Sequence, residues 1–524
     1  MAPTAESSGA KPFTNEPPVD FTRPENRQAM QQALEKVGRE LGREYENVIG
    51  GHRRRTTARL QSINPSHPEQ VVGRFQSAGP EDASAAVEAA QTAFESWKRT
   101  SAERRAELLF RVAHAFRQHR FEWCAWLVYE VGKNWGEADA DVAEAIDFAE
   151  FYGREALRLA KARTPVQLPG ERDELEYIPL GVGAVIPPWN FPLAIMSGMT
   201  MAAIVTGNTV VLKPSGDAMA IAAHFFQTLE ECGMPDGVVN FVTGSGGSFG
   251  EALVRHPRTR FIAFTGSKEV GLRIHELAAQ PQPGQIWIKR TILEMGGKDA
   301  IVVDADSDLD EAVQGVVASA FGFSGQKCSA CSRAIVDERI YDKFVERLKE
   351  RTQRLTVSAA EENPALGPVI NEGARNSILK YVEQALREGG RLITGGRAVE
   401  GRDGYLIEPT IVSEVKPGHT LEQKEVFGPV LAVVRCSDFN EGLRIANDTE
   451  FGLTGAVYTQ SEERMEQARR EFHVGNLYIN RKCTGAMVGA HPFGGFNMSG
   501  TDSKAGGADY LLLFTQAKSI ARKL

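Results

Sequence analysis

The chain has 524 residues, of which 42% are hydrophobic and 24% charged, and its formal net charge is −8. This length predicts two to four domains, with cores large enough to need no disulfide or metal staple. The negative charge argues against nucleic-acid binding, which depends on clustered lysine and arginine. Six cysteines are too few for a disulfide framework, and residues 1–21 contain no apolar signal segment, so we expect a reduced, cytoplasmic protein without a membrane anchor.

The N-terminal third of the chain is mainly helical by pattern. Positions 1–23 are polar with closely spaced prolines, which predicts an extended arm. Pro24 and Pro80 each precede a helical run, as is typical of a proline in the first turn of a helix. Thr100 and Glu103 have the spacing of a capping box and predict the start of a third helix.

The pattern changes near residue 182, where short β-rich runs alternate with helical stretches. The uncharged run 181–212 is long enough to cross a bilayer, but Pro187, Pro188 and Pro192 interrupt it. It therefore predicts a buried strand, an apolar helix and a second strand. Such alternation is typical of a parallel sheet with helices on both faces.

A second alternating set is expected to begin with TILEMGG at 291–297 and to include a helix over 308–321, with a change of domain near residue 295. The last ten residues, TQAKSIARKL, predict a strand that is a candidate for pairing with another subunit. Toward the other end of the chain, Gly50 and Gly51 predict the turn of a short hairpin.

Two glycine-containing turns, at 244–250 and 265–271, each follow a predicted strand. Backbone N–H groups at such a turn, with a helix dipole behind them, suit a pyrophosphate. Neither turn has the GxGxxG pattern, and each alone is more often an ordinary turn. Lys213, at the end of a predicted strand, is either a solvated lysine or a donor to a nucleotide.

Cys328 and Cys331 form a Cys-x-x-Cys pair. A structural zinc site needs two further ligands at short spacing, and no second pair exists, so we expect no metal. Cys331 and the isolated cysteines are expected to be small core residues. Cys328 differs, because a loop of small residues precedes it and Lys327 adjoins it, and both features favour an exposed thiolate.

Glu294 and Asn190 are further candidates for chemistry. Glu294 lies in an apolar run, where a carboxylate is costly to bury unless its pKa is raised, as a general base requires. A strand-end glutamate that reaches solvent is the slightly favoured alternative. The Asn190 amide either donates to an oxyanion or caps a turn. The ten histidines offer no clear base for a Cys–His hydrolase, and His491 is the only loop candidate.

Seven segments together resemble the aldehyde dehydrogenase superfamily, in family order across residues 45–520: PWNFP, LKPS, FTGS, LEMGGK, FSGQKC, KEVFGPV and PFGGFNMSG. Four further segments resemble the branch that oxidises L-glutamate γ-semialdehyde: YEVGKNWGEADADVAEAIDFAEFY, GQKCSACSR, EFHVGNLYINRK and CTGAMVGAHPFGG. No proline dehydrogenase domain is appended, so we expect the stand-alone enzyme.

The resemblance implies an α/β fold with a Rossmann-type NAD-binding domain, an α/β catalytic domain and a β oligomerisation arm. It also implies a homo-oligomer, either a dimer or an assembly of dimers. The expected boundaries are 1–40 for an N-terminal arm, 41–162 and 181–295 for the NAD-binding domain, 296–497 for the catalytic domain, and 163–180 and 498–524 for the oligomerisation arm.

The resemblance also assigns catalytic roles. Cys328 would add to the aldehyde carbon, and the Asn190 amide and the Cys328 backbone N–H would hold the oxyanion. After hydride transfer, Glu294 would activate the water that hydrolyses the thioester.

For the cofactor, the resemblance implies NAD. NADP is not excluded, because the position where many relatives carry a ribose-binding glutamate is Gly216. The cofactor-binding residues that it implies are Trp189, Lys213, Ser215, Gly266, Ser267, Glu425 and Phe427.

For the substrate, small residues would let N–H groups converge on an α-carboxylate. The residues implied for this side are Glu144, Phe191, Ser329, Gly485, Ala486 and Phe493.

The leading hypothesis is therefore NAD-dependent oxidation of L-glutamate γ-semialdehyde to L-glutamate, the second step of proline breakdown. Within the family, a dehydrogenase of another semialdehyde, such as succinate semialdehyde, is the alternative. From other classes, the alternatives are a cysteine hydrolase and a binding or structural protein that keeps the fold without turnover.

Overall fold

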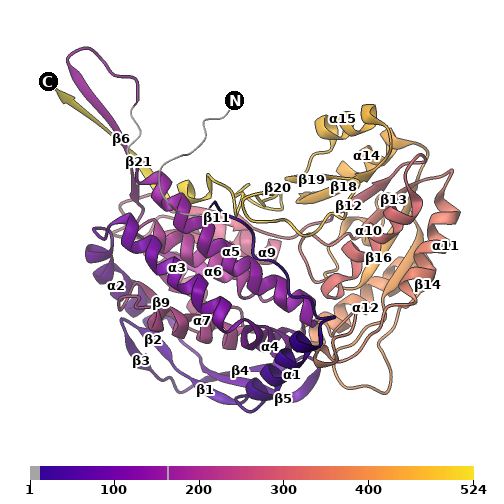
Figure 1. Cartoon of the computed structure of the whole chain (residues 1–524), viewed down its shortest axis with the longest axis horizontal. Helices are drawn as coiled ribbons and strands as arrows, with labels where there is room; N and C mark the ends of the chain where they lie inside the picture. Colours follow the sequence, from indigo (N-terminus) through magenta and orange to yellow (C-terminus); the bar gives the residue numbers. More distant parts are fainter. Residues whose placement is uncertain (1–11, 162–164) are drawn as a thin grey trace.

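Two seven-stranded sheets organise residues 12–161 and 165–524, which are the residues that the computed structural model describes (Figure 1). The mixed α/β fold class predicted from the sequence is confirmed. The expected extended arm is described from residue 12 onward, and its first eleven residues lie outside the described part of the chain.

The first sheet has the order β11-β10-β7-β8-β9-β2-β3, and the strands from β11 to β9 run parallel. Its strands are β7 (Val182–Ile186), β8 (Thr209–Leu212), β9 (Val239–Phe241), β10 (Thr259–Thr265), β11 (Arg290–Glu294), β2 (Asn47–Ile49) and β3 (His52–Arg54). The last two are antiparallel and are joined at Gly50 and Gly51, as predicted.

Helices cover both faces of this sheet because its strands are apolar on both sides. Along β10, Phe261 and Ala263 enter one core, whereas Ile262 and Phe264 enter the other. The helices of the first core are α1 (Pro24–Gly38), α3 (Ala102–Gln118), α4 (Arg120–Val131), α5 (Trp135–Leu159), α6 (Ala194–Val205) and α7 (Met219–Glu231), and those of the second are α2 (Pro80–Trp97), α8 (Glu251–Arg255) and α9 (Lys268–Ala279).

The second sheet has the order β14-β15-β16-β13-β12-β18-β19 and is parallel except for β14 at one edge. Its strands are β12 (Ala300–Val303), β13 (Arg333–Asp337), β14 (Arg391–Thr394), β15 (Thr410–Val415), β16 (Val430–Cys436), β18 (Thr454–Tyr458) and β19 (Asn476–Ile479). The helices of this half are α10 (Leu309–Phe321), α11 (Tyr341–Thr352), α12 (Glu372–Arg387), α13 (Thr420–Gln423), α14 (Phe439–Asn447) and α15 (Glu462–Glu471).

Three small sheets complete the structure. The ribbon of β6 (Glu171–Pro179) and β21 (Thr515–Lys523) is antiparallel and projects from the rest of the chain (Figure 1). The other two sheets join β1 (Arg43–Tyr45), β5 (His67–Gln76) and β4 (Arg59–Asn64), and β17 (Phe451–Gly452) with β20 (Phe496–Asn497).

Most predicted element starts agree with the structure, but two differ. Helices α1 and α2 begin at Pro24 and Pro80 as expected. The cap of α3 is not Thr100 but Ser101, whose hydroxyl accepts a hydrogen bond from the Arg104 N–H at 3.4 Å. The β-run in TILEMGG forms β11 and pairs with β10, so it closes the first sheet rather than opening the second.

Within the residues that the structure describes, no helix is both long and apolar enough to cross a membrane. The apolar run near residue 200 instead forms β7, α6 and β8, as the prolines predicted.

Candidate active site

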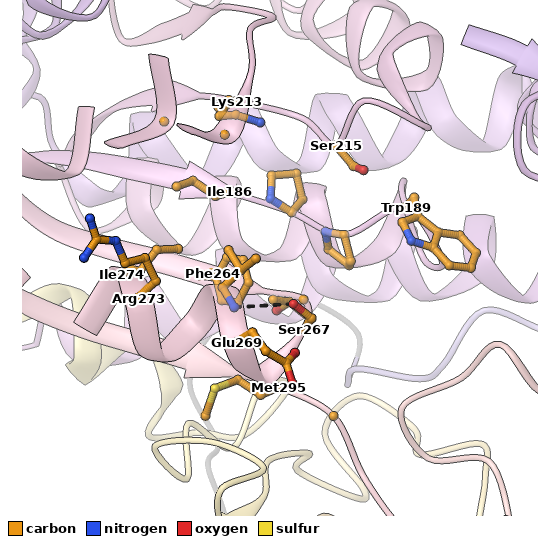
Figure 2. Close-up of a pocket in the computed structure, with 18 of the residues that line it drawn as sticks. Ile186, Trp189, Lys213, Ser215, Phe264, Ser267, Glu269, Arg273, Ile274 and Met295 are labelled. Carbon is orange, nitrogen blue, oxygen red and sulfur yellow. Dashed lines mark hydrogen bonds between the residues drawn. The ribbon is translucent and has the colours of Figure 1, made fainter. Parts of the chain in front are cut away.

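A cavity of about 670 Å³ lies at the carboxyl ends of β7, β8 and β10, where ligands bind in open parallel sheets (Figure 2). Loops of the second half of the chain complete its wall. Nine of the residues expected at the site line it: Trp189, Asn190, Lys213, Ser215, Gly266, Ser267, Cys328, Glu425 and Phe427.

The start of α9 provides one wall of the cavity. Ser267 caps this helix, since its hydroxyl accepts a hydrogen bond from the Val270 N–H at 3.4 Å (Figure 2). Gly246 and Gly247, on the turn after β9, also line the cavity, and nothing lies within 4 Å of a Cβ built on either. A helix N-terminus beside an open backbone turn fits a pyrophosphate.

Between α8 and α9 the lining becomes apolar. Val254, Ile274 and Leu277 contribute aliphatic side chains there. An apolar slot beside an anion-binding helix end fits a nucleotide, whose flat base needs such a surface.

Lys213 is buried, contrary to the solvated alternative. Its ammonium donates to the Pro214 carbonyl at 3.0 Å, and burial lowers its pKa to about 8. Figure 2 shows it across the cavity from Glu269 and Met295. Gly216 lines the same side, and a Cβ added to it would meet nothing within 4 Å.

Glu425 and Phe427 contribute the wall opposite the first sheet. A carboxylate oxygen of Glu425 accepts a hydrogen bond from the Gly297 N–H at 2.9 Å, and burial raises the pKa of Glu425 to about 7. The Phe427 ring packs edge-on against Trp189, with ring centroids 5.5 Å apart.

Cys328 faces this cavity, but its thiol differs from the sequence expectation. Burial, and then the charges of Asp299 and Glu425, raise the pKa of Cys328 well above its usual value. Lys327 does not offset them, because its ammonium lies 2.7 Å from a Glu137 carboxylate oxygen. Cys328 is partly exposed, but the thiolate that Lys327 was expected to favour is not stabilised.

Asn190 follows β7 and is buried beside the cavity. Its amide donates to the Gln326 carbonyl at 3.1 Å, two residues before Cys328. The structure thus places the amide next to the loop that carries the thiol.

Glu294 ends β11 and does not line the cavity. Its carboxylate accepts hydrogen bonds from the Ser503 hydroxyl at 2.7 Å and from the Gly495 N–H at 3.3 Å. Burial nevertheless raises the pKa of Glu294 to about 7, and its charge contributes to the raised pKa of Cys328. Glu294 is thus a partly buried group held by a loop, not a glutamate that reaches solvent.

The six residues expected on the substrate side lie outside the cavity lining. Phe191 packs against the Lys133 ammonium, which is 3.9 Å from the ring centroid. Glu144 lies on α5, and burial followed by the Asp141 charge raises its pKa to about 8.

Ser329 is joined to the loop that contains Gly485 and Ala486 by the Cys483 thiol, which lies 3.5 Å from the Ser329 carbonyl oxygen. Phe493 exchanges backbone hydrogen bonds with Ala505 at 2.7 and 2.8 Å.

Sequence reasoning missed Lys133, which is fully buried. Its ammonium lies 3.0 Å from an Asp141 carboxylate oxygen, and burial lowers its pKa. A buried lysine eight residues before an aspartate gives no distinctive pattern. Its neighbours Glu130, Asn134 and Glu137 are polar, so the local sequence gives no sign that it is buried.

The other cysteines are mostly core residues, as predicted. Cys124, Cys331, Cys436 and Cys483 are buried, but Cys232 is only partly buried, so the expectation is wrong for it. Within the described residues, no group of three or more His, Cys, Asp or Glu side chains could hold a metal ion.

The site combines a thiol, an amide donor and a carboxylate whose pKa is raised, and its cavity suits a nucleotide. A thiol is a good nucleophile toward a carbonyl carbon, and an amide beside it can stabilise the resulting oxyanion. The chemistry that these groups suit is oxidation of a carbonyl compound with a dinucleotide.

Comparisons with known proteins agree with this chemistry. Residues 52–520 match the sequence description of the aldehyde dehydrogenase family. The chain is 55% identical to the 1-pyrroline-5-carboxylate dehydrogenase of Geobacillus thermodenitrificans, over 98% of this chain and 99% of the relative. It is 53% identical to 1-pyrroline-5-carboxylate dehydrogenase 2 of Bacillus subtilis, over 97% and 99%.

A solved structure of a Thermus 1-pyrroline-5-carboxylate dehydrogenase with bound NAD superposes with a TM-score of 0.97. Its sequence identity is 51%, and the match covers 99% of this chain and 100% of that one.

Proposed function

We propose that this chain, which belongs to the aldehyde dehydrogenase family, oxidises L-glutamate γ-semialdehyde to L-glutamate with NAD. The semialdehyde forms when 1-pyrroline-5-carboxylate opens, so this is the second step of proline breakdown. The observation that carries the proposal is identity above 50% to 1-pyrroline-5-carboxylate dehydrogenases along almost the whole chain. Cys328 and Asn190 line a cavity that suits a dinucleotide, in agreement with it.

Cys328 is the nucleophile in this proposal. Its sulfur, once deprotonated, adds to the aldehyde carbon and forms a tetrahedral oxyanion. The Asn190 amide and the Cys328 backbone N–H donate to that oxygen. NAD supplies the acceptor for the hydride that leaves the carbon, and the product on the sulfur is a thioester.

Glu294 is the base that removes a proton from the water that hydrolyses this thioester. A pKa of about 7 suits a general base near neutral pH. Because its carboxylate is held by Ser503 and Gly495, the side chain must turn toward Cys328 to act. The hydrolysis releases L-glutamate and restores the thiol.

The cavity supplies the NAD site. Ser267, Gly246 and Gly247 surround the position suited to the pyrophosphate, and Lys213 with Ser215 lies on the adenosine side. Gly266, Trp189, Glu425 and Phe427 take the remaining cofactor positions that the family resemblance assigns. NAD is the cofactor bound in the Thermus structure. The open space at Gly216 leaves room for NADP as an alternative to NAD.

The substrate side is assigned by the same reasoning. Backbone N–H groups of Gly485 and Ala486, with Ser329, hold the α-carboxylate, and Phe191 and Phe493 flank the aliphatic chain. Glu144 places the α-amino group. Burial and the Asp141 charge disfavour the ionised form of Glu144 by raising its pKa, and a bound α-ammonium would favour that form.

The rival functions make different demands. A cysteine hydrolase needs a histidine base, and no histidine is among the described residues that line the cavity. A dehydrogenase of succinate semialdehyde would use the same catalytic groups but would not need to recognise an α-amino acid. Identity to the 1-pyrroline-5-carboxylate enzymes favours L-glutamate γ-semialdehyde as the substrate.

We infer the domain organisation from membership of the two sheets. Residues 41–162 and 181–295 form the NAD-binding domain, residues 296–497 form the catalytic domain, and 163–180 with 498–524 form an arm for homo-oligomerisation. In support, β6 and β21 pair only with each other among the described strands. A two-stranded ribbon is marginally stable unless something packs against it.

All six cysteines are free thiols, which suits the cytoplasm.

Steady-state kinetics test the proposed function. NADH formation is followed at 340 nm with 1-pyrroline-5-carboxylate, succinate semialdehyde and butanal as substrates. We expect kcat/KM to be highest, by at least about 100-fold, for 1-pyrroline-5-carboxylate, because only its open form carries both the α-carboxylate and the α-amino group. Equal kcat/KM values for the three compounds would contradict the substrate assignment.

A further inference from the structure

We infer that residues 12–23, here called the N-terminal brace, position the loop that grips the substrate and thereby set the affinity for the semialdehyde. The loop is residues 484–491, here called the grip loop, and it contains Gly485 and Ala486. This inference rests on the proposed function, since it concerns the same substrate site. The residue that carries it is Asn15, which lies about 470 positions away from the loop in sequence.

The Asn15 amide joins the brace to two parts of the substrate side. It donates one hydrogen bond to an Asp147 carboxylate oxygen at 2.8 Å and the other to the Val488 carbonyl oxygen at 3.0 Å. A side-chain amide has two N–H donors, and both are used here. Val488 is buried and lies two residues after Ala486, so the amide fixes the backbone next to the proposed carboxylate grip.

A second contact supports the same part of the loop. Phe13 packs edge-on against Phe151, with ring centroids 5.3 Å apart. A Cβ built on Gly489 would lie 3.2 Å from each of these two rings, so the loop backbone lies against both of them. Gly489 also has a φ of +79°, a conformation that favours glycine.

The brace itself is firmly attached to α5. The Glu16 and Val19 N–H groups donate to the carboxylates of Asp147 and Asp139 at 2.7 Å each. The Arg120 guanidinium lies 2.6 Å from an Asp139 oxygen, and Arg120 is mostly buried. Asp147 and Asp139 are partnered by the brace, so their burial depends on its being in place.

The same helix carries Glu144, the residue proposed to hold the α-amino group. Asp147 lies three residues later, which places it on the same face, one turn of helix away. The Asp147 charge is among those that raise the pKa of Glu144. The brace therefore meets both elements that are proposed to hold the amino-acid end of the substrate.

The grip loop needs such support because it has little structure of its own. Residues 484–487 form neither helix nor strand, and Gly485 and Met487 are exposed. Beyond the brace, the Gly489 N–H donates to the Gly506 carbonyl at 2.8 Å, and the Arg481 guanidinium donates to the carbonyls of Thr484 and Gly485 at 3.0 and 3.2 Å. Within the loop, the His491 N–H donates to the Met487 carbonyl at 2.8 Å. Among the residues that the structure describes, Asn15 is the one side chain that donates to the Val488 carbonyl.

The test compares Asn15→Ala with a matched control, Asn26→Ala. The Asn26 amide donates to the Asp20 carbonyl at 2.9 Å and, within the described part of the chain, makes no hydrogen bond to α5 or to the grip loop. Each variant is assayed for NADH formation with 1-pyrroline-5-carboxylate and with butanal, which has no carboxylate to grip. Far-UV circular dichroism and urea unfolding report the folded state.

We expect Asn15→Ala to raise the KM for 1-pyrroline-5-carboxylate by about tenfold, the size of effect that loss of a charge-assisted hydrogen bond produces. The kcat, the KM for NAD and kcat/KM for butanal should stay within about twofold of wild type. Asn26→Ala should match wild type throughout. Asn15→Ser, which keeps one donor, should give an intermediate KM.

Two results would overturn the inference. One is a KM for 1-pyrroline-5-carboxylate unchanged in Asn15→Ala, and the other is an equal loss of activity with both aldehydes. Failure of the proposed function is distinguished in the wild type, which would then show no preference for 1-pyrroline-5-carboxylate over butanal.

Discussion

Burial shifts the proton affinity of the reactive groups in the direction that removes charge. It raises the pKa values of Glu294 and Glu425 to about 7 and lowers that of Lys213 to about 8. The pKa of the Cys328 thiol is raised as well, because three carboxylates add to the effect of burial. These surroundings favour the protonated thiol over the thiolate.

The pH dependence of turnover follows from the Glu294 pKa. As a base, Glu294 must be deprotonated, so we expect kcat to fall about tenfold per pH unit below about pH 7. The measurement is NADH formation at saturating 1-pyrroline-5-carboxylate between pH 5.5 and about 9. Glu294→Gln should lose the inflection near pH 7, because hydrolysis of its thioester no longer depends on a base with that pKa. An inflection that persists in Glu294→Gln would remove Glu294 from the role of base.

At the residue scale, the sequence predicted which groups lie near the cavity better than it predicted their ionisation. Asn190 and Cys328 belong to recognisable motifs, and the fold brings both to the cavity. The predicted effect of Lys327 on the Cys328 thiol was wrong, because Lys327 pairs with Glu137, 190 positions earlier. The hydrogen bond from the Ser503 hydroxyl to Glu294 was missed for the same reason, because the two residues lie 209 positions apart.

Helix α7 shows how one element depends on another for its cap. Its N-cap residue, Ala218, has no side chain that can accept a hydrogen bond. Instead Glu130, fully buried near the end of α4, accepts from the Ala220 and Ile221 N–H groups at 2.6 and 2.8 Å. A carboxylate at this position also interacts favourably with the helix dipole.

We expect Glu130→Ala to lower the free energy of unfolding by roughly 2–4 kcal/mol, because two buried N–H groups lose their acceptor. Urea unfolding followed by circular dichroism measures it. Glu107→Ala is the control, since among the described residues that exposed glutamate pairs only with Arg111 one turn later, at 3.5 Å. Its loss should cost less than about 1 kcal/mol. Equal unfolding free energies for both variants would contradict the capping role.

At the element scale, local sequence signals predicted the starts of helices correctly. Contacts between elements that are distant in the sequence could not be predicted. The prolines at positions 24 and 80 marked helix starts because proline fits the first turn whatever surrounds it. The cap of α7 could not be predicted, because its acceptor comes from a helix 90 positions earlier. The strand in TILEMGG was identified as a strand, but its sheet depends on long-range pairing with β10.

For the whole molecule, the β6–β21 ribbon is the feature that points beyond a single chain. Nine residue pairs join the two strands, and most β21 side chains are exposed. Val166, Leu168 and Leu524, close to the ribbon in sequence, are 86%, 56% and 79% exposed. Exposed apolar side chains next to a projecting ribbon are a surface suited to another copy of the chain.

We expect the wild-type protein to have a multiple of the chain mass in analytical ultracentrifugation. A chain truncated after residue 515 loses β21 and should sediment as a single chain, while its NAD affinity stays unchanged, because the cavity is built from other elements. A single-chain mass for the wild type, or an unchanged assembly after truncation, would contradict the role of the ribbon.

The most direct test of the account is to identify where the substrate carbon becomes bonded to the protein. Glu294→Gln is incubated with NAD and 1-pyrroline-5-carboxylate, quenched in acid, and mapped by peptide mass spectrometry. We predict one glutamyl group as a thioester on the peptide that contains Cys328, formed with a burst of NADH, and none in Cys328→Ala, which still binds NAD. NADH formation with the group on another residue, or with no adduct in Glu294→Gln, would contradict the account.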